Sequence, residues 1–444
     1  MILTFLYTIS MLKTLKNLGR AIIPRSIFRA LQPYWHGSIA LLANAYFGNP
    51  SKDIKVIGVT GTNGKSTTVN LIASVLEEAG HKTGLISTVN FKVSDTEKLN
   101  DMKMTTPSGW LMQKWLREMV RNKFEYAVLE ISSQGLEQNR HLGINFDVAV
   151  FTNLTPEHIE AHGGFDQYKK AKGLLFSALK QNQTGRPTTV IANADDDHFE
   201  YFINFPATTH ISFGVKNQSA NLIATNVEAS PSGVSFQSQN TPFKLQLKGK
   251  FDVYNALAAI AVGQSQNISL DTCKSALEKI SVVPGRMEIV QAQPFMVLVD
   301  YAPEPYSLQA LYDTVAQWPK QRLIHILGST GGGRDRARRQ TLGQMAGKTA
   351  DIVIVTNEDP YDDNPQTIIN EVAGGAFSEG KVSGENLFSI LDRREAIAFA
   401  IKQARPGDLV LITGKGSEQK MAVAHGNYID WDDRQVAREE LAKL

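Results

Sequence analysis

The sequence has a single cysteine, no long apolar run and almost no net charge. Because Cys273 is alone among 444 residues, an internal disulfide and a cysteine-rich zinc cluster are excluded. The formal net charge is +2 at pH 7, so the composition implies no general attraction to nucleic acid. No stretch reaches the roughly 18–20 uninterrupted apolar residues that span a bilayer. These absences favour a globular protein in a reducing, cytoplasmic setting.

The first 50 residues contain two apolar patches with basic residues between them. The opening MILTFLYTIS is followed, rather than preceded, by basic residues, which is the wrong order for a secretory signal. A segment of this kind can lie on a membrane surface as a peripheral contact. It can equally be a helical extension whose apolar face packs on the rest of the protein. We expect the packed helical extension, over residues 1–54.

From Lys55 onwards, short apolar runs alternate with segments of helical spacing. The runs KVIGVTG, KTGLIST, YAVLEIS and DVAVFTNL have the composition of buried strands. Strands that alternate with helices form a mostly parallel sheet covered on both faces. A more polar, β-rich stretch extends from about Thr188 to Lys250 and precedes a helix near Asp252. The pattern predicts a central α/β domain of P-loop type over residues 55–283.

A junction follows at SVVPGRMEIV, where Pro-Gly ends the preceding helical segment. The alternation then restarts with the strand-like runs FMVLVDYA, RLIHILGS, DIVIVTN and DLVLITG. We therefore expect a second, smaller Rossmann-like α/β domain over residues 284–444.

The strand KVIGV leads directly into the glycine-rich turn TGTNGKST, at Thr60–Thr67, and then into a helix. Backbone N–H groups of such a turn face an anion, a lysine reaches terminal phosphates, and a hydroxyl can ligate Mg²⁺. The strict P-loop spacing would need a glycine where Val59 stands. A turn that binds nothing is the alternative, but the strand, turn and helix together favour a nucleotide site. The predicted phosphate-binding residues are Thr62, Asn63, Gly64, Lys65, Ser66 and Thr67.

This loop has the form found in the Mur ligases, and nine further segments follow in the order of that family. They are TTP, LEISSQGLEQNR, FTNLTPEHIEAHGGFDQYKKAKGLLF, GKFDVYNALAA, VPGRME, GSTGGGRDRARR, TNEDPYDDNP, LDRREAI and GKGSE. The sequence most resembles the branch of UDP-N-acetylmuramoyl-tripeptide synthetases, which add the third residue of the peptidoglycan stem peptide. The resemblance covers the chain from about Lys55 to the C-terminus.

The resemblance implies an ATP-dependent ligase that forms a C–N bond in peptidoglycan synthesis. ATP would phosphorylate a carboxylate of a muramoyl-peptide acceptor, and the amine of an amino acid would attack the resulting acyl phosphate. Two alternatives stay open. One is a ligase of the same superfamily with another acceptor, such as a folylpolyglutamate-like or cell-wall amide ligase. The other is a nucleotide-binding regulator without ligase activity.

The resemblance also implies roles for the residues near the phosphate loop. Glu130, at the end of YAVLE, and His158 would hold Mg²⁺ together with Ser66, and Lys65 would bind phosphate. Lys172 would be the carbamylated lysine of the family, although a lysine run such as YKKAK is more often a solvated face. Taken alone, Glu130 and His158 are equally consistent with a solvated strand end and a hydrogen-bonded histidine.

Further positions match the family's nucleotide and substrate contacts. Asn255 would contact adenine, and Arg286 and Asp300 would contact the nucleotide from the second half of the chain. Without the resemblance, Asn255 would be a helix-surface amide, Arg286 a linker surface charge and Asp300 a strand-end cap. A glycine-rich segment with Arg334, Asp335 and Arg339 belongs to the domain that would close over the nucleotide. The residues that would hold the muramoyl-peptide acceptor are Thr105, Thr106, Ser132 and Arg140.

Four departures from the family pattern concern the substrates. Only about 54 residues precede the first strand, so we expect the usual N-terminal UDP-binding domain to be missing. The motif DYAHTPDS is here DYAPEPYS, with Pro303 and Tyr306 in place of a histidine and an aspartate. GKGHE is here GKGSE, which places Ser417 before Glu418, and Asp252 stands where the family has an asparagine. Glu418 stays available for the incoming amino group.

The fourth departure lies in the segment that selects the amino acid. The family motif DNPR aligns with Glu358, Asp359, Pro360 and Tyr361, so the arginine that pairs with the distal carboxylate of diaminopimelate is absent. The carboxylates of Asp359, Asp362 and Asp363 suit an amine better than a carboxylate. We therefore favour lysine or another diamine, with Asp359 as a substrate-binding residue, over an acidic loop without function.

Overall fold

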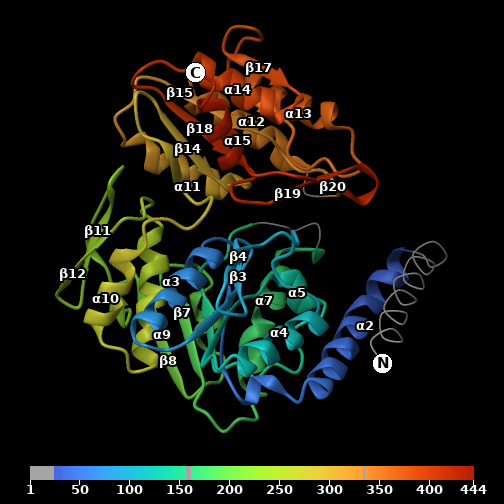
Figure 1. Cartoon of the computed structure of the whole chain (residues 1–444), viewed down its shortest axis with the longest axis vertical. Helices are drawn as coiled ribbons and strands as arrows, with labels where there is room; N and C mark the ends of the chain where they lie inside the picture. The colour runs from blue at the N-terminus through green and yellow to red at the C-terminus, as the bar shows by residue number, and fades with distance from the viewer. Residues whose placement is uncertain (1–24, 157–161, 334–335) are drawn as a thin grey trace.

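The computed structural model describes residues 25–156, 162–333 and 336–444. Two α/β units are stacked on one another, and helix α2 (Arg25–Tyr46) lies along the side of the first (Figure 1). The predicted α/β class, with mostly parallel sheets, is confirmed. Among the described helices, none is both long enough and apolar enough to cross a membrane. His158, Arg334 and Asp335 lie outside the described residues.

In the described part of the chain, nine strands form the central sheet in the order β4-β3-β2-β5-β1-β6-β7-β8-β9. Neighbouring strands are parallel from β2 to β9, while β3 and β4 form an antiparallel edge. The strands are β1 Lys55–Thr60, β2 Thr83–Ile86, β3 Asn90–Lys92, β4 Glu97–Leu99, β5 Tyr126–Glu130, β6 Val148–Phe151, β7 Thr189–Asn193, β8 Thr209–Gly214 and β9 Leu222–Ile223.

Helices cover both faces of this sheet because both sides of each central strand are apolar. In β1, Ile57 and Val59 pack under α3, α9 and α10, while Val56 packs on the opposite face with α4 and α7. The helices of this unit are α3 Lys65–Glu78, α4 Gly109–Arg121, α5 Ser133–Glu137, α7 Phe165–Leu179, α8 Phe199–Ile203, α9 Asp252–Ser265 and α10 Leu270–Lys279.

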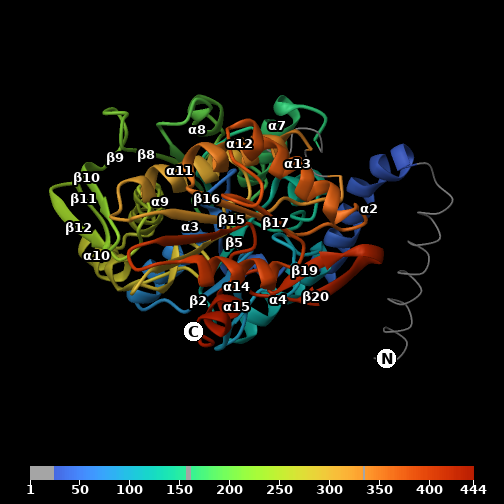
Figure 2. The same cartoon turned by 90° about the horizontal axis from the view of Figure 1, so that it is seen from above.

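The β-rich stretch predicted after Thr188 adds β7 to β9 to the central sheet and then forms a separate antiparallel sheet. That sheet consists of β10 Thr225–Ser230, β11 Gly233–Ser238 and β12 Thr241–Leu245. Figure 2 shows it beside α10, on the side of the molecule opposite α2. Phe236 and Phe243 stack with their ring centres 4.8 Å apart. Both belong to the core cluster that includes α9, so they join this small sheet to the central unit.

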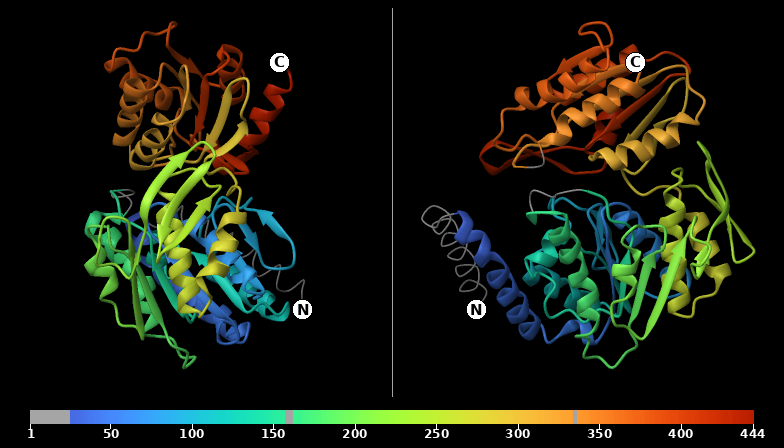
Figure 3. Two further views of the ribbon diagram at one scale, coloured as in Figure 1. Left: turned by 90° about the vertical axis from the view of Figure 1, so that its left-hand side faces the viewer. Right: turned by 180° about the vertical axis from the view of Figure 1, so that it is seen from behind.

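The second unit contains a six-stranded sheet among the described residues, in the order β13-β14-β18-β15-β16-β17. Only its edge pair β13–β14 is antiparallel. Helices α11 to α13 cover one face and α14 and α15 the other (Figure 3). The elements are β13 Glu288–Gln291, β14 Met296–Asp300, α11 Pro305–Ala316, β15 Leu323–Leu327, α12 Ala337–Thr349, β16 Ile352–Thr356, α13 Pro365–Ser378, β17 Leu387–Ile390, α14 Arg393–Gln403, β18 Leu409–Thr413 and α15 Asp433–Leu441.

A short hairpin, β19 (Lys420–Val423) with β20 (Asn427–Asp430), projects from this second unit. The chain passes from one sheet to the other between α10 and β13, where the junction was predicted. The domain limits 1–54, 55–283 and 284–444 stay predictions.

Helix α2 packs on the central unit through small residues. Ala40 and Ala43 are fully buried, and the chain of α4 comes so close that a side chain at Gly109 would meet Ala40. The described part of the N-terminal segment, α2, is therefore a packed helix. Its other side leaves large apolar groups exposed, namely Leu31, Tyr34, Trp35, Leu41, Leu42 and Tyr46.

Candidate active site

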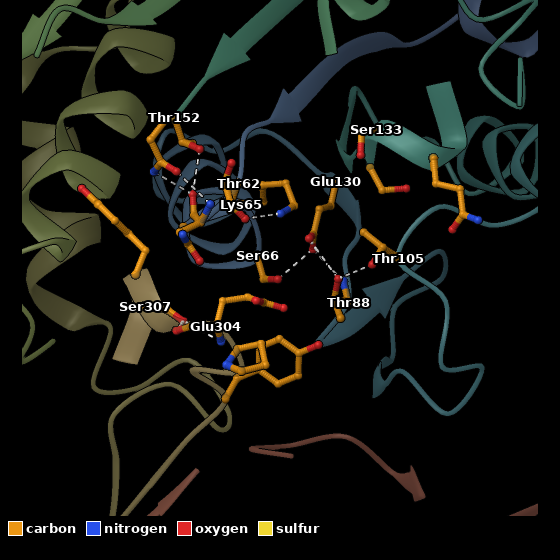
Figure 4. A pocket seen from close by; sticks show the side chains of 18 of the residues that line it. Thr62, Lys65, Ser66, Thr88, Thr105, Glu130, Ser133, Thr152, Glu304 and Ser307 are labelled. Carbon is orange, nitrogen blue, oxygen red and sulfur yellow. Dashed lines mark hydrogen bonds between the residues drawn. The ribbon is translucent and has the colours of Figure 1, made fainter. Parts of the chain in front are cut away.

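A cleft of about 1120 Å³ lies between the two units, at the carboxyl ends of the central parallel strands. Ligands of α/β proteins bind at this edge, because the loops and helix N-termini after the strands converge there. The phosphate loop, the end of β5 and the segment before α4 line the cleft from below. Loops after β14, β15, β16 and β18 line it from above. Figure 4 shows the lower wall, with Lys65, Ser66 and Glu130 facing the same space.

The phosphate loop has the strand–turn–helix geometry that the sequence predicted. Gly64, with φ of 81°, is the N-cap of α3, and a Cβ there would lie 2.3 Å from Oδ1 of Asn255. Only glycine satisfies both demands. The Lys65 ammonium donates to the Thr62 carbonyl at 2.7 Å, so it lies over its own loop. The start of α3 lines the cleft, and backbone N–H groups at the N-terminus of a helix can bind an anion.

Glu130 lies against the first turn of α3. Its Oε2 accepts hydrogen bonds from the Ser66 hydroxyl at 2.8 Å and the Thr88 backbone N–H at 2.7 Å. Its Oε1 accepts from the Thr88 hydroxyl at 2.9 Å. Glu130 is nearly completely buried, so these bonds fix the carboxylate in place. The sequence did not single out Thr88, which belongs to no recognised motif.

A hydroxyl and a carboxylate side by side are oxygen ligands of the kind that Mg²⁺ prefers. Ser66 and Glu130 therefore fit the magnesium ion that a nucleotide would bring. The predicted partner His158 lies outside the described residues. Within the described residues, no group of three or more histidine, cysteine, aspartate or glutamate side chains forms a metal centre.

Lys172 is buried in α7 and faces the phosphate loop rather than solvent. Its ammonium donates to the Gly61 carbonyl at 2.6 Å and lies 4.4 Å from the ring centre of Tyr168. The hydroxyl of Tyr168 is 3.1 Å from that of Thr62. Of the three lysines in YKKAK, Lys170 is exposed and Lys172 is the one that lines the cleft. The solvated-face interpretation is therefore wrong for Lys172.

The four predicted acceptor residues lie together on one wall of the cleft. The hydroxyls of Thr106 and Ser132 are 3.1 Å apart, and Arg140 donates to the Thr106 carbonyl at 2.7 Å. The hydroxyls of Thr105 and Thr88 lie 2.9 Å apart. Next to them, the Ser133 hydroxyl lies 3.0 Å from Nε2 of His162, a pair that sequence reasoning did not identify.

The predicted nucleotide contacts meet where the two units join. Asn255 donates to Asp252 at 3.1 Å and accepts from Thr68 at 3.1 Å. Burial, aided by the nearby Asp300 carboxylate, raises the pKa of Asp252 to about 7. Asp300 accepts from the backbone N–H groups of Met287 and Ala302, and burial raises its pKa as well.

Arg286 lies at the edge of the same region and lines the cleft. Its guanidinium is 4.6 Å from the ring centre of Tyr301, next to Asp300. The arginine therefore presents its charge to the cleft from the segment that links the two units.

The segment that replaces DNPR does not present three free carboxylates. Asp359 is buried in the cleft wall, where it pairs with Lys415 at 3.1 Å and with Lys103. Asp362 accepts from the His425 backbone N–H, and Asp363 accepts from Arg339 at 3.2 Å. Neither Asp362 nor Asp363 lines the cleft. The expectation of a three-carboxylate site is therefore wrong, and the acidic group at this place is Asp359 with Glu418.

Other departures are accommodated by local contacts. Glu304, in the altered DYAPEPYS segment, pairs with Arg338 and caps α11. Tyr306 is largely exposed at the cleft, and Pro303 lines it nearby. Glu358 is buried, and burial raises its pKa to about 7, although Arg338 opposes the shift.

Two family models match the chain. One, described as the Mur ligase middle domain, matches residues 59–263, and the other, described as the Mur ligase glutamate ligase domain, matches residues 285–416. The chain belongs to the Mur ligase family. The segment of this Mur ligase that carries the phosphate loop, Glu130 and Lys172 lies within the first match, and Asp359 lies within the second.

Similar proteins agree with this assignment. The UDP-N-acetylmuramoyl-L-alanyl-D-glutamate–2,6-diaminopimelate ligase of Geobacillus thermodenitrificans is 39% identical over 90% of this chain and 81% of its own length. The UDP-N-acetylmuramyl-tripeptide synthetase of a Roseiflexus species is 38% identical over 96% of this chain and 90% of its own length.

Among solved structures, a UDP-N-acetylmuramoyl-L-alanyl-D-glutamate–2,6-diaminopimelate ligase is 29% identical to this Mur ligase, with a TM-score of 0.59 over 88% of this chain and 78% of its own. A folylpolyglutamate synthase from Mycobacterium tuberculosis has a TM-score of 0.68 at 17% identity, over 85% of this chain and 92% of its own. At that identity the second likeness shows the shared fold alone.

Proposed function

We propose that this Mur ligase is an ATP-dependent amino-acid ligase that adds the third residue to a UDP-N-acetylmuramoyl-dipeptide-like acceptor in peptidoglycan synthesis. The observation that carries the proposal is the cleft itself. Its lower wall holds a phosphate loop with Ser66 and Glu130 2.8 Å apart, and its upper wall holds the Asp359–Glu418 pair. The residues that we propose for nucleotide and metal thus face those that we propose for an amine across one space.

Lys65, the loop N–H groups and the start of α3 would bind the phosphates, while Ser66 and Glu130 would hold Mg²⁺. Bound Mg²⁺–ATP supplies the phosphoryl group that activates the acceptor carboxylate as an acyl phosphate. Asn255, Arg286 and Asp300 would position the nucleotide at the junction of the two units. Their placement at one edge of the cleft supports this role.

We assign Lys172 as the carbamylated lysine. The support is its position, because a buried lysine whose Nζ is 2.6 Å from the Gly61 carbonyl lies directly behind the phosphate loop. A carbamate there would add two oxygens that share one negative charge to the metal side of the site. Intact-mass measurement or crystallography of the active, ATP-bound enzyme tests the assignment. An ordinary amine at residue 172 would overturn it.

The acceptor peptide would lie along Thr105, Thr106, Ser132 and Arg140. A guanidinium and three hydroxyls suit the carboxylates and amides of a peptide. Glu418 and Asp359 would bind an ammonium group of the incoming amino acid, which favours a diamine such as lysine. The Geobacillus relative is named as a ligase of 2,6-diaminopimelate, which also carries two amino groups.

Peripheral membrane contact would use the apolar side of α2. Tyr34, Trp35 and Leu42 are exposed there, and aromatic groups of this kind favour a membrane interface. We keep the packed extension as the main role of the helix and expect the reaction to occur in the cytoplasm.

Phosphate release from ATP tests the proposed function. The assay combines UDP-muramoyl-dipeptide with a panel that includes lysine, ornithine and diaminopimelate. Turnover that requires both substrates supports the proposal. Parallel reactions replace UDP-muramoyl-dipeptide with a folate or a lipid-linked acceptor, and turnover only there would assign a different ligase activity. Tight ATP binding without turnover would assign a regulator.

A further inference from the structure

Four charged side chains meet across the cleft and form a closed cluster, which we call the cross-domain cluster: Lys103, Asp359, Lys415 and Glu418. The Lys103 ammonium contacts Asp359, lies 3.0 Å from Glu418 and donates to the Lys420 carbonyl at 3.2 Å. Lys415 lies 3.1 Å from Asp359 and 2.5 Å from Glu418. The Lys103 side chain is only 8% exposed and that of Lys415 is fully buried.

The acceptors around Lys103 match the needs of one ammonium group. A primary ammonium has three N–H donors, and Asp359, Glu418 and the Lys420 carbonyl supply three acceptors. All three acceptors belong to the second unit, whereas Lys103 enters from the segment between β4 and α4 of the first. The second unit therefore carries three acceptors that bind two ammonium groups, its own Lys415 and Lys103 of the other unit.

Lys415 shows that this site does not need Lys103 to keep its shape. It comes from the same unit as both carboxylates, contacts each of them and donates to the same Lys420 carbonyl at 2.7 Å. Burial opposes its charge, but Glu418 and Asp359 outweigh that effect and raise the pKa of Lys415 above its ordinary value. Asp359 also accepts from the Ala422 backbone N–H at 2.7 Å. The carboxylates thus stay anchored when Lys103 leaves.

Two features make the buried position of Lys103 energetically less favourable, namely its backbone conformation and the burial of its ammonium group. Its backbone is left-handed, with φ of 50°, a conformation that residues other than glycine rarely adopt. Burial, with repulsion from Lys415, lowers the pKa of Lys103, although Glu418 and Asp359 oppose the shift. An occupant that carries backbone strain and desolvation is easier to displace than one that carries neither.

We propose that Lys103 is an internal occupant of the ammonium site and that the incoming amino acid binds by displacing it. The inference rests on the proposed ligase function, and it adds a residue that sets the apparent affinity for the amino acid. With Lys103 in place, the cluster is neutral and joins the two units. With the amino acid in place, the substrate ammonium makes the same three contacts and Lys103 moves into the cleft.

Chemical labelling of lysines tests the displacement. The full-length protein is treated briefly with acetic anhydride in the presence of a non-hydrolysable ATP analogue, with and without L-lysine or meso-diaminopimelate. Mass spectrometry then measures acetylation at Lys103 and at Lys98, which is exposed on β4 and serves as the internal control. We expect low labelling of Lys103 that rises at least about threefold when an amino acid occupies the site, with Lys98 unchanged.

Substitution gives a second measurement. Lys103→Met keeps an unbranched side chain only one atom shorter than lysine but removes its charge, so it removes the competitor. We expect the KM for the amino acid to fall by roughly fivefold or more, while the KM for ATP stays unchanged. Lys98→Met is the matched control and should leave both values unchanged. Lys103→Arg keeps the charge and should keep a KM near that of the unsubstituted protein.

The outcomes separate this inference from the proposed function. If the protein turns over with an amino acid but neither probe raises Lys103 labelling, the displacement is wrong and the ligase function stands. A KM for the amino acid that rises in Lys103→Met would also overturn it, because Lys103 would then assist binding. If no acceptor and amino acid support turnover, the ligase function fails, and unchanged Lys103 labelling with both probes would reject the displacement as well.

Discussion

The Ser66 hydroxyl lies 2.8 Å from a carboxylate oxygen of Glu130, and this contact joins the first turn of α3 to the last residue of β5. The two residues are 64 positions apart, yet the parallel pairing of β1 with β5 brings them to one edge of the sheet. Both lie where a nucleotide-bound magnesium ion would be coordinated. The contact therefore makes the proposed metal site directly testable.

Glu130→Gln should raise the Mg²⁺ concentration needed for half-maximal activity by about tenfold or more. Glutamine retains the size of the side chain and can still accept from Ser66 and Thr88, but it removes the anionic ligand. A Mg²⁺ titration of ATP-dependent phosphate release measures the change. Glu137→Gln, on the nearby α5, is the control, and an equal shift in both variants would argue against a metal role for Glu130.

Lys65→Ala should reduce ATP-dependent ligation by at least about 100-fold, because the only side-chain ammonium of the phosphate loop is lost. Its contact to the Thr62 carbonyl lies within the loop, so the melting temperature should change little. Lys98→Ala provides the control for the loss of one lysine. Retained ligation in Lys65→Ala would overturn the assignment of the loop.

Asp252→Asn should make the protein more stable at neutral and alkaline pH. The folded-state pKa of Asp252 is about 7, above the ordinary value of 3.8, so the folded state binds its proton more tightly. That stabilisation is fully present below about pH 4 and is lost as the pH rises through about 7. Asparagine resembles the protonated acid and does not ionise.

The variant should therefore exceed the unsubstituted protein by roughly 2–4 kcal/mol at pH 8 and match it near pH 4. Urea unfolding between pH 4 and 8 measures the difference, with the exposed Asp313→Asn as control. A difference between Asp252→Asn and the unsubstituted protein that does not depend on pH would contradict the raised pKa.

Arg393→Met should cost about 3–5 kcal/mol of unfolding free energy, because it leaves the buried Asp433 carboxylate without its cation. The Arg393 guanidinium lies 2.7 Å from a carboxylate oxygen of Asp433, and the side chains of Arg393 and Asp433 are 1% and 0% exposed. Arg394→Met removes a neighbouring arginine whose pairs are partly exposed, and it should cost no more than about 1 kcal/mol. Equal losses in the two variants would show that burial does not decide the effect.

Local patterns in the sequence predicted the elements that build the lower wall. The strand β1, the turn around Gly64 and the helix α3 are contiguous, so their glycine, lysine and hydroxyl spacing is sufficient to identify them. Glu130 was predictable because it ends an apolar run, and parallel strands end at the same edge. The alternation of strands and helices likewise predicted both large sheets.

Contacts between distant segments were not predictable in this way. Lys103 and Asp359 are 256 residues apart, and no periodicity or motif connects them. The acidic residues next to Asp359 in the sequence suggested that three carboxylates share one site. A turn at Tyr361, with φ of 52°, instead separates Asp359 from Asp362 and Asp363. The antiparallel edge β3–β4 was missed because its strands are three residues long and polar.

The most direct test of the account is the stoichiometry of the reaction. Purified protein is incubated with Mg²⁺–ATP, UDP-muramoyl-dipeptide and the amino acid that supports turnover, and phosphate and peptide product are counted together. The proposed ligase reaction releases one phosphate for each C–N bond formed, and neither product should appear when the acceptor or the amino acid is omitted. Phosphate release without peptide product, or product formed without ATP, would contradict it.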